Sequence, residues 1–275
     1  MSRLATILAL SVAVLLSGCG ASNSRNSANS PSTPSPGQPS GTPSTPNIAG
    51  NWQFNATSNI PGNPPLTFAG NIGQTNSEVS GALHADGSSC FNQLTIMGLT
   101  GAVTAGSTSL TSTPLNGQVV TFTFSNTTFT GTYKINGGCD AGDQGSVTGA
   151  NVSLANADGW SGTFTSSAQK AFNAAGNFAQ STSASPEGSL GITGTATFDT
   201  PCFSAATISA GSYPTGNFIL GTLVSLQIET DNGTVAFLGT VNPLTEIISG
   251  TYNVVGGTCD QTGTAVLALG GQWDY

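Results

Sequence analysis

The sequence predicts an all-β protein made of two tandem, homologous antiparallel units of about eight strands each, either β-barrels or β-sandwiches. Three observations lead to this prediction. Charged residues make up only 6% of the 275 residues, whereas glycine alone contributes 37. Short runs alternate apolar and polar residues between turn signals, which is typical of strands rather than helices. Motifs of the first half also recur in the second half in the same order.

The N-terminus has the features of an export signal followed by a lipid attachment site. Arg3 precedes the apolar run Leu4–Leu16, which is shorter than the ~20 residues a spanning helix needs but fits a signal peptide. The following Leu16-Ser17-Gly18-Cys19 resembles the lipobox of bacterial lipoproteins. The resemblance implies that residues 1–18 are removed and that Cys19 becomes the acylated, palmitate-bearing N-terminus. Gly20, rather than Asp, implies the outer membrane; the alternative is an ordinary secretory signal with an incidental cysteine.

Residues 19–47 are predicted to be a disordered tether that starts at the lipidated cysteine. After Cys19 this segment is rich in Ser and Pro and contains no aromatic residue, Val, Ile or Leu. Such a segment cannot bury enough apolar surface to offset the entropy cost of ordering its chain. We therefore expect the membrane to be a partner through the N-terminal anchor alone.

Internal repeats divide the remainder into two units, predicted at residues 48–154 and 155–275. Trp52 and Trp160 open the two copies, and AGNIGQ (Ala69–Gln74) returns as AGNFAQ (Ala175–Gln180). The other repeated motifs are VSG and ITG at 79–81 and 192–194, Cys-Phe at 90–91 and 202–203, and GTYKINGGCD and GTYNVVGGTCD at 131–140 and 250–260. Recurrence of these motifs in one order indicates two homologous units.

Each unit is predicted to consist of short antiparallel strands. Tyr133 and Ile135 alternate with Thr132 and Lys134, and Asp-Gly or Asn-Gly hairpin signals occur at 86–87, 116–117 and 232–233. In the first unit, strands are expected near residues 50–57, 65–73, 78–85, 93–103, 107–112, 118–125, 128–136 and 145–154. Eight such strands fit an up-and-down barrel or a two-sheet sandwich. The glycines within strands, such as Gly131 and Gly250, suit a close approach of backbones.

Short motifs in these units resemble those of calycin-type barrels. Gly50-Asn51-Trp52 resembles the G-x-W motif of lipocalins, and the terminal QWDY (272–275) is similar to avidin-like barrels. This resemblance implies a barrel, but the polar residues of the avidin pocket do not map onto the sequence residue by residue. As a whole the chain resembles Gly/Thr-rich lipoproteins of bacterial envelopes, which implies no particular activity.

Four cysteines lie within the repeats, two in each copy. They allow three pairings, and the repeat favours Cys90–Cys139 and Cys202–Cys259, each worth roughly 4 kcal/mol by loop closure. A thiolate metal site would need close Cys and His pairs, which the sequence lacks, so no metal or cofactor is predicted. Asp140 and Asp260 follow the second cysteine of each unit; they are weak candidates for a cation site and stronger candidates for turn residues.

Few residues are suited to catalysis, and no enzyme activity is predicted. The single histidine, His84, lies two residues before Asp86, but the second copy has no histidine at the matching position. A Ser-His-Asp triad is thus less favoured than a polar residue at the end of a strand. Carboxylates near the bridges, Asp86 with Asp140 and Asp199 with Asp260, leave a glycan-acting enzyme as a remote alternative.

Trp52 and Trp160 lie at equivalent strand starts and have two interpretations. Their equivalence favours a role in core packing. The alternative is a ligand platform inside each barrel, because eight-stranded barrels are either filled by side chains or hold one small ligand.

The charge balance excludes two classes of partner. With a net charge of −8 and only four Lys and Arg residues, the chain lacks the basic surface that nucleic acids or anionic headgroups require. The leading prediction is a lipid-anchored cell-envelope protein, a non-enzymatic binding or structural module for an unknown protein or small-molecule partner. The alternatives are a calycin-like carrier of a small apolar ligand and, more remotely, a 16-stranded outer-membrane barrel or the glycan-acting enzyme.

Overall fold

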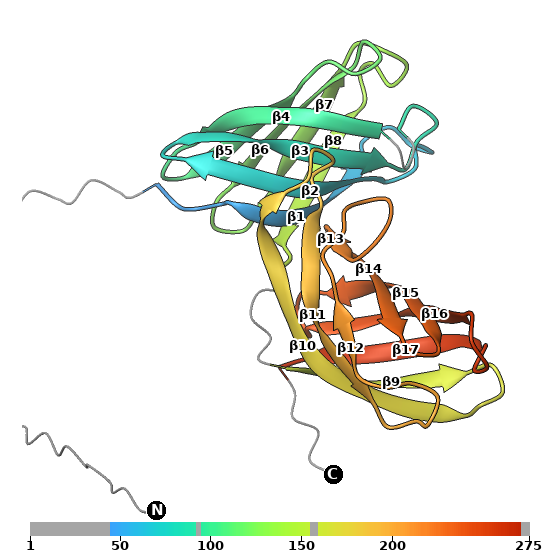
Figure 1. Ribbon diagram of the computed structural model, residues 1–275. Helices are drawn as coiled ribbons and strands as arrows, with labels where there is room; N and C mark the ends of the chain where they lie inside the picture. The colour runs from blue at the N-terminus through green and yellow to red at the C-terminus, as the bar shows by residue number, and fades with distance from the viewer. Residues whose placement is uncertain (1–44, 92–94, 155–158, 271–275) are drawn as a thin grey trace, which may run out of the picture. The chain divides into compact units, whose positions relative to one another are not determined.

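The chain folds into two closed antiparallel β-barrels in tandem (Figure 1). The computed structural model describes residues 45–91, 95–154 and 159–270. The predicted all-β class with two eight-stranded units is confirmed, and the units are barrels rather than sandwiches. Residues 1–44 and 271–275, which include the predicted signal peptide, the predicted lipid attachment site Cys19 and the QWDY motif, lie outside the described residues. Within the described part, there is no helix long and apolar enough to cross a membrane.

The first barrel is an up-and-down meander. Its strands are β1 (Gly50–Ser58), β2 (Leu66–Thr75), β3 (Glu78–Asp86), β4 (Thr95–Val103), β5 (Ser107–Ser112), β6 (Val119–Ser125), β7 (Thr130–Asn136) and β8 (Gln144–Asn151). Each strand pairs with the next, and β8 returns to β1 with Gly149 opposite Phe54. These strands fall within a few residues of the ranges that alternation and turn signals predict.

The second barrel follows the same course with one interruption. Its strands are β9 (Trp160–Ser166), β10 (Ala171–Ala184), β11 (Leu190–Phe198), β12 (Ala206–Ile208), β13 (Phe218–Leu220), β14 (Leu223–Thr230), β15 (Gly233–Asn242), β16 (Ile247–Val255) and β17 (Thr262–Leu269). The β10–β11 pairing closes the ring, and β12 is added as a further strand on β11. Strand β11 pairs with both β12 and β13, so these two short strands together occupy the place that β4 has in the first barrel.

Large apolar side chains fill the barrel interiors, and small polar side chains face outward. Strand β6 buries Val120, Phe122 and Phe124, while Thr121 and Thr123 lie on its other face. Outer-membrane barrels show the opposite pattern, with apolar residues toward lipid and a polar lumen. The alternative of one 16-stranded outer-membrane barrel is therefore wrong, because the strands close into two separate rings with an outward polar face.

The glycines within strands mark places where neighbouring backbones come close. A Cβ atom on Gly131 would meet the carbonyl oxygen of Thr123, and one on Gly250 would meet that of Leu238. In each case any side chain would collide with the adjacent strand, so glycine at this position belongs to the barrel architecture of both copies.

The repeated glutamine of the AGN motif has the same role in both barrels. The Gln74 side-chain oxygen accepts the backbone N–H of Ile48 at 2.7 Å, and the Gln180 oxygen accepts that of Leu154 at 3.1 Å. In each copy this bond ties the segment before the first strand to the second strand. Leu154 also packs in the hydrophobic core of the second barrel, so the chain leaving β8 is held by that barrel.

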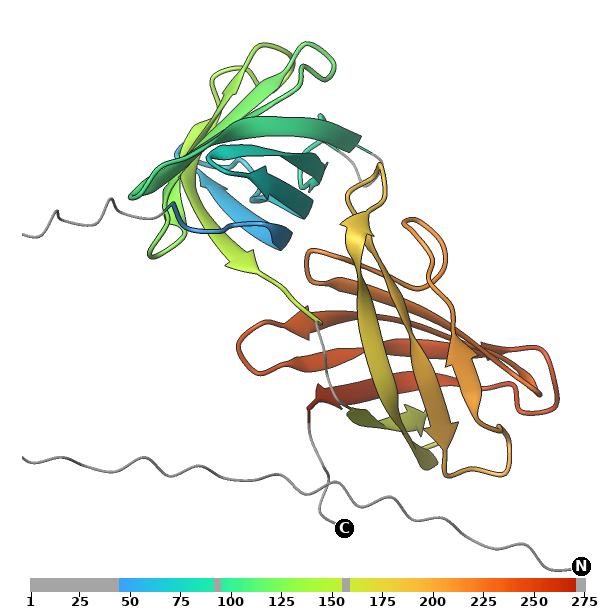
Figure 2. The same ribbon diagram turned by 60° about the vertical axis from the view of Figure 1, so that its left-hand side comes forward.

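The β10–β11 hairpin contacts the first barrel. Strand β10 is 14 residues long, and Figure 2 shows this hairpin extending past the other strands of the second barrel. Gly188, in its tip, has a φ of +82° and lies against the backbone of Ala82 on β3, with no room for a Cβ atom. The tip therefore fits against the outer face of β3.

Candidate functional site

A buried asparagine joins the two barrels next to the candidate site. Asn51, on β1, is 1% exposed. Its Nδ2 donates to the carbonyl oxygens of Gly221 (2.8 Å) and Val152 (3.1 Å), and its Oδ1 accepts the N–H of Gly221 at 2.7 Å. The side-chain amide thus pairs with both polar groups of one residue of the second barrel.

Gly221 is required at this contact for two reasons. Its φ of +55° lies in the left-handed region that favours glycine, and a Cβ atom there would lie 2.7 Å from the Cβ of Ala69 and against Oε1 of Gln53. The N–H of Thr222 also donates to Oε1 of Gln53 at 3.3 Å. The turn between β13 and β14 therefore packs directly on β1 and β2.

A cleft of about 650 Å³ lies beside this contact. Its first-barrel side, which we call the polar floor, consists of two rows of residues that lie side by side on β1, β2 and β3. The rows are Gln53–Ala69–His84 and Asn55–Thr67–Asp86. These side chains point outward because they alternate with the core residues of the same strands.

The second-barrel side of the cleft, which we call the apolar wall, is mainly hydrophobic. It consists of Tyr213, Pro214, Phe218, Leu220, Leu223 and Leu238, with Thr222 as a polar member. The Tyr213 ring packs edge-on against Phe218 with centroids 5.5 Å apart, and Leu238 is 54% exposed. A few polar groups facing apolar side chains in a cavity of this size are typical of small-molecule sites.

His84 is the most perturbed residue of the polar floor. Its side chain is 7% exposed, and its ring centroid lies 4.8 Å from that of Tyr213. Burial lowers the pKa of His84, and the nearby Asp86 carboxylate offsets this shift in part. Nε2 is buried and has no hydrogen-bond partner within the described residues. An unpaired buried nitrogen costs about 1–3 kcal/mol, so a molecule that bonded to it would stabilise the protein.

The arrangement around His84 differs from that of a catalytic triad. A triad requires a serine hydroxyl hydrogen-bonded to one imidazole nitrogen and a carboxylate bonded to the other. Among the residues that the structure describes, no hydroxyl pairs with Nε2 of His84. The group is an imidazole whose pKa is lowered by burial and which packs against an aromatic ring.

The structure pairs the four repeat cysteines as the repeat predicts. Cys90 and Cys139 have Cα atoms 6.2 Å apart, and those of Cys202 and Cys259 are 5.9 Å apart, both within the usual range for disulfides. The Cys90–Cys139 bridge joins the loops that follow β3 and β7, and the Cys202–Cys259 bridge joins the matching loops of the second barrel.

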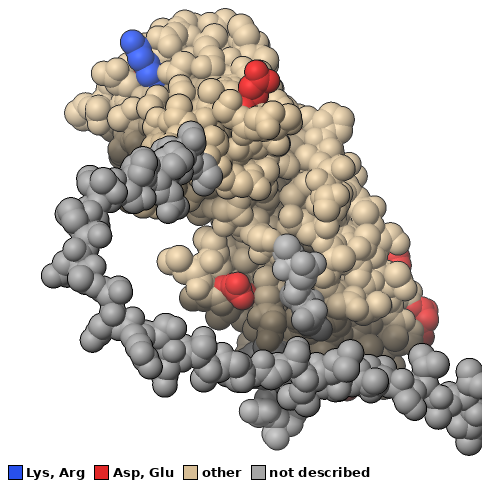
Figure 3. Space-filling view, turned by 90° about the vertical axis from the view of Figure 1, so that its left-hand side faces the viewer, with Lys and Arg blue, Asp and Glu red and all other residues tan. Residues whose placement is uncertain are grey.

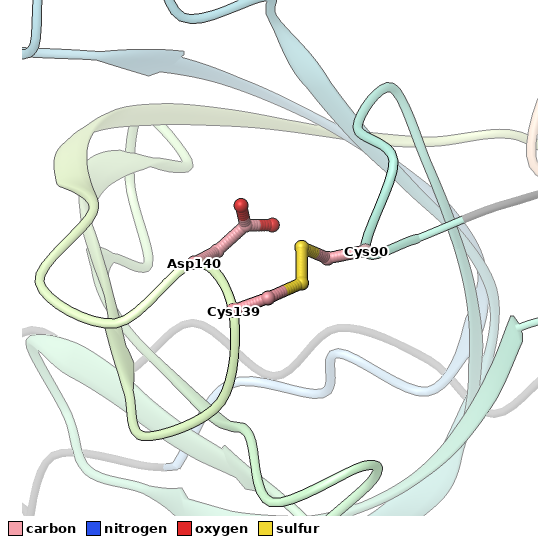
Figure 4. A group of neighbouring side chains, drawn as sticks. All are labelled: Cys90, Cys139 and Asp140. Carbon is pink, nitrogen blue, oxygen red and sulfur yellow. A yellow bond between two sulfur atoms is a disulfide. The ribbon is translucent and has the colours of Figure 1, made fainter.

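Asp140 lies beside the first bridge (Figure 4). Within the described residues, Cys90, Cys139 and Asp140 are the one group of three metal-ligating side chains close together. Both sulfur atoms belong to the disulfide, and Oδ2 of Asp140 accepts the Ser88 hydroxyl at 2.7 Å. The group therefore offers a cation one carboxylate that is already hydrogen-bonded. Asp260, the second candidate, is solvent-exposed.

Both candidate tryptophans lie in the barrel cores, each 1% exposed. Trp52 stacks on Phe54 with centroids 5.6 Å apart, and Trp160 stacks on Phe178 at 5.0 Å. Nε1 of Trp52 donates to the carbonyl oxygen of Ile48 at 2.8 Å. These contacts are those of the packing role, and neither tryptophan lines the cleft.

Sequence reasoning missed the cleft except for His84 and Asp86. A position-by-position comparison of the two copies would have found part of it. Asn51 of the first copy matches Gly159 of the second, and His84 matches Thr197. Such differences mark positions at which the barrel fold common to both copies does not require a particular residue.

Comparisons with known proteins leave the family open. No protein-family model matches the sequence. A search of curated proteins finds no match. A solved structure of a porin-like protein from Bacteroides uniformis is 12% identical over 82% of this chain and 98% of that chain, with a TM-score of 0.18. That score is too low to show a shared fold.

Proposed function

We propose that this chain is a lipid-anchored, non-catalytic binding protein of the bacterial cell envelope, with its ligand site in the cleft between the two barrels. The observation that supports a ligand most strongly is His84, whose buried Nε2 lacks a partner while its side chain lines the cleft. A ligand that hydrogen-bonds to Nε2 would satisfy this buried nitrogen.

The same proposal covers the organisation of the chain. A signal peptide (1–18) directs export, Cys19 carries the lipid in the outer membrane, and the tether (19–47) holds the two units (48–154 and 155–275) close to it. The lipobox-like Leu16–Cys19 and the Ser/Pro-rich composition that follows support this organisation. Two bridged barrels, paired by the Asn51–Gly221 contact, then present the cleft as a preformed site.

Native mass spectrometry of the protein purified from its own envelope tests the ligand site. We expect a reproducible non-covalent adduct that is lost in Thr67→Trp, because Thr67 lies in the middle of a floor row and a large side chain would fill the cleft. Thr123→Trp is the matched control, since Thr123 is an exposed outward residue of β6 outside the cleft. An adduct that persists in Thr67→Trp, or no adduct at all, contradicts the proposal.

Metabolic labelling with an alkyne-bearing palmitate tests the anchor separately. The wild-type protein should incorporate the label and fractionate with outer membranes. Cys19→Ser should lose both properties while keeping both bridged barrels. Label found elsewhere in the chain would contradict anchoring at Cys19.

A further inference from the structure

The polar floor of the first barrel can be compared with the matching residues of the second barrel. Its residues Thr163, Asn173 and Asp199 match Asn55, Thr67 and Asp86 in the repeat. Their side chains bond to one another: the Thr163 hydroxyl donates to Oδ1 of Asn173 at 2.9 Å, and Nδ2 of Asn173 donates to Oδ2 of Asp199 at 2.8 Å. On this face of the second barrel the polar groups therefore satisfy each other.

In the first barrel, the matching side chains do not hydrogen-bond to one another. In the described part of the chain, no side-chain hydrogen bond joins Asn55, Thr67 and Asp86; Oδ1 of Asp86 accepts the adjacent N–H of Gly87 at 2.8 Å. Amide, hydroxyl and carboxylate groups are thus left facing the cleft together. Amides and hydroxyls both donate and accept, and the carboxylate accepts, which suits a ligand with several hydroxyl groups.

The charged residues of the described chain narrow the class of ligand that the cleft can bind. The described cations are Lys134 and Lys170, and neither lines the cleft. Figure 3 shows a face on which charged side chains are sparse. Asp86 is the one acidic residue among the lining residues, and no lysine or arginine is among them. An anionic ligand would be repelled and would find no cation to pair with.

The apolar wall supplies the complementary surface. Tyr213 and Pro214 present a ring and a pyrrolidine to the cleft, opposite the polar floor. A sugar ring has hydroxyl groups at its rim and C–H groups on its faces. Its rim can bond to the floor while a face packs on the wall, and a tyrosine offers an apolar body at small entropic cost.

We propose that the cleft binds a neutral saccharide. This inference rests on the proposed function and specifies its ligand class. Asn55, Thr67 and Asp86 bind ring hydroxyl groups, and Tyr213 with Pro214 covers the opposite face of the sugar. A volume of about 650 Å³ places the cleft among sites for small molecules, ~300–1,000 Å³, so the fitting ligand is a short saccharide rather than a polymer.

Isothermal titration calorimetry with the detergent-solubilised full-length mature protein tests this inference. The probes are maltotriose, cellotriose, mannotriose and N,N′,N″-triacetylchitotriose as neutral sugars, with 3′-sialyllactose as an anionic sugar and triglucosamine as a cationic one. We expect at least one neutral trisaccharide to bind more tightly than both charged probes. Asp86→Asn and Asn55→Ala should each weaken its binding tenfold or more.

The matched controls lie at the equivalent positions of the second barrel. Asp199→Asn and Thr163→Ala should leave the dissociation constant unchanged. Binding of no neutral probe, tighter binding of a charged probe, or equal effects of the two sets of variants would overturn the inference. A native adduct that is lost in Thr67→Trp but contains no sugar would overturn it and leave the proposed ligand site standing. Absence of any adduct and any sugar binding would overturn both.

Discussion

The side-chain amide of Asn51 and the backbone of Gly221 form two reciprocal hydrogen bonds, 2.8 Å from Nδ2 to the Gly221 carbonyl and 2.7 Å from the Gly221 N–H to Oδ1. The residues lie 170 positions apart in the chain, one in each barrel. Because the pair is buried, water cannot replace either bond. This relationship ties the two barrels together beside the cleft.

Asn51→Ala should destabilise the protein by about 2–6 kcal/mol. The substitution leaves the buried N–H and C=O groups of Gly221 without partners, and each unsatisfied group costs about 1–3 kcal/mol. Urea unfolding followed by tryptophan fluorescence measures the loss. We also expect the ligand adduct to weaken, because the wall would no longer be held against the floor.

Asn71→Ala is a suitable control for this experiment. Asn71 pairs with Asn51 in the β1–β2 register, and its own Oδ1 is buried without a partner. Its removal should cost much less than that of Asn51. Equal losses in the two variants would mean that the Gly221 bonds contribute nothing specific.

Trp52→Phe should be more destabilising than Trp160→Phe by about 1 kcal/mol. Both substitutions remove a similar side-chain volume from a barrel core. Only Trp52→Phe also removes a hydrogen bond, the one from Nε1 to the Ile48 carbonyl oxygen. Nε1 of Trp160 is buried without a partner among the described residues. A typical hydrogen bond contributes about 1 kcal/mol. Chemical denaturation of the two variants gives the difference directly, and equal losses would contradict the assigned packing.

Removing either disulfide should destabilise the protein by roughly 4 kcal/mol or less. The bridges span 49 and 57 residues, and loop-closure entropy gives nearly the same value for both. Calorimetry of Cys90→Ala/Cys139→Ala and of Cys202→Ala/Cys259→Ala measures each loss. Cys19→Ser is the control and should leave the melting temperature unchanged. A melting temperature insensitive to both double substitutions would contradict the pairing.

His84 should titrate below its usual pKa of 6.5, because burial disfavours the charged imidazole. The stabilisation due to neutral His84 is then fully present above pH 6.5 and is lost as the pH falls through the lower folded-state pKa. His84→Gln should therefore flatten the decline in melting temperature between pH 7.5 and pH 5. An identical decline in wild type and variant would show that His84 does not contribute.

Asp86→Asn isolates the electrostatic part of this behaviour. The Asp86 charge raises the pKa of His84 against the larger effect of burial, so its removal should lower the pKa further. Burial, and to a smaller extent the Asp86 charge, also raise the pKa of the neighbouring Tyr213. NMR titration of the imidazole signals measures the shift, and a rise in pKa would contradict the assignment.

The fold follows from local pattern because small antiparallel barrels are built from neighbouring strands. Alternation around Tyr133 and turn signals such as Asn116-Gly117 predict strands that then pair with the next in order. The split of β12 from β13 was not predictable, since it depends on the Asn217 side chain. That amide donates to the Ser209 carbonyl at 2.6 Å and accepts the Gln227 N–H at 2.5 Å, in place of ladder bonds.

The site was much less predictable than the fold. Gln53, Asn55 and Thr67 look like ordinary outward residues, and only tertiary packing places Tyr213 and Leu238 opposite them. His84 and Asp86 could be singled out because histidine and aspartate are suited to binding and catalysis. Their surroundings could not be predicted, because Tyr213, which packs on His84, is far away in the sequence. Trp52 and Trp160 were candidates for ligand binding because they are aromatic. Both lie in the barrel cores, because large apolar side chains are needed to fill the interior of an eight-stranded barrel.

The most direct test of the cleft uses the fact that His84 is the only histidine in the chain. Protein labelled with [¹⁵N]histidine gives one pair of imidazole signals, which can be followed as the small-molecule fraction of the envelope extract is added. A ligand in the cleft should shift the Nε2 signal in wild type and in Thr123→Trp but not in Thr67→Trp. An adduct that forms while the His84 signals stay unchanged would contradict the account.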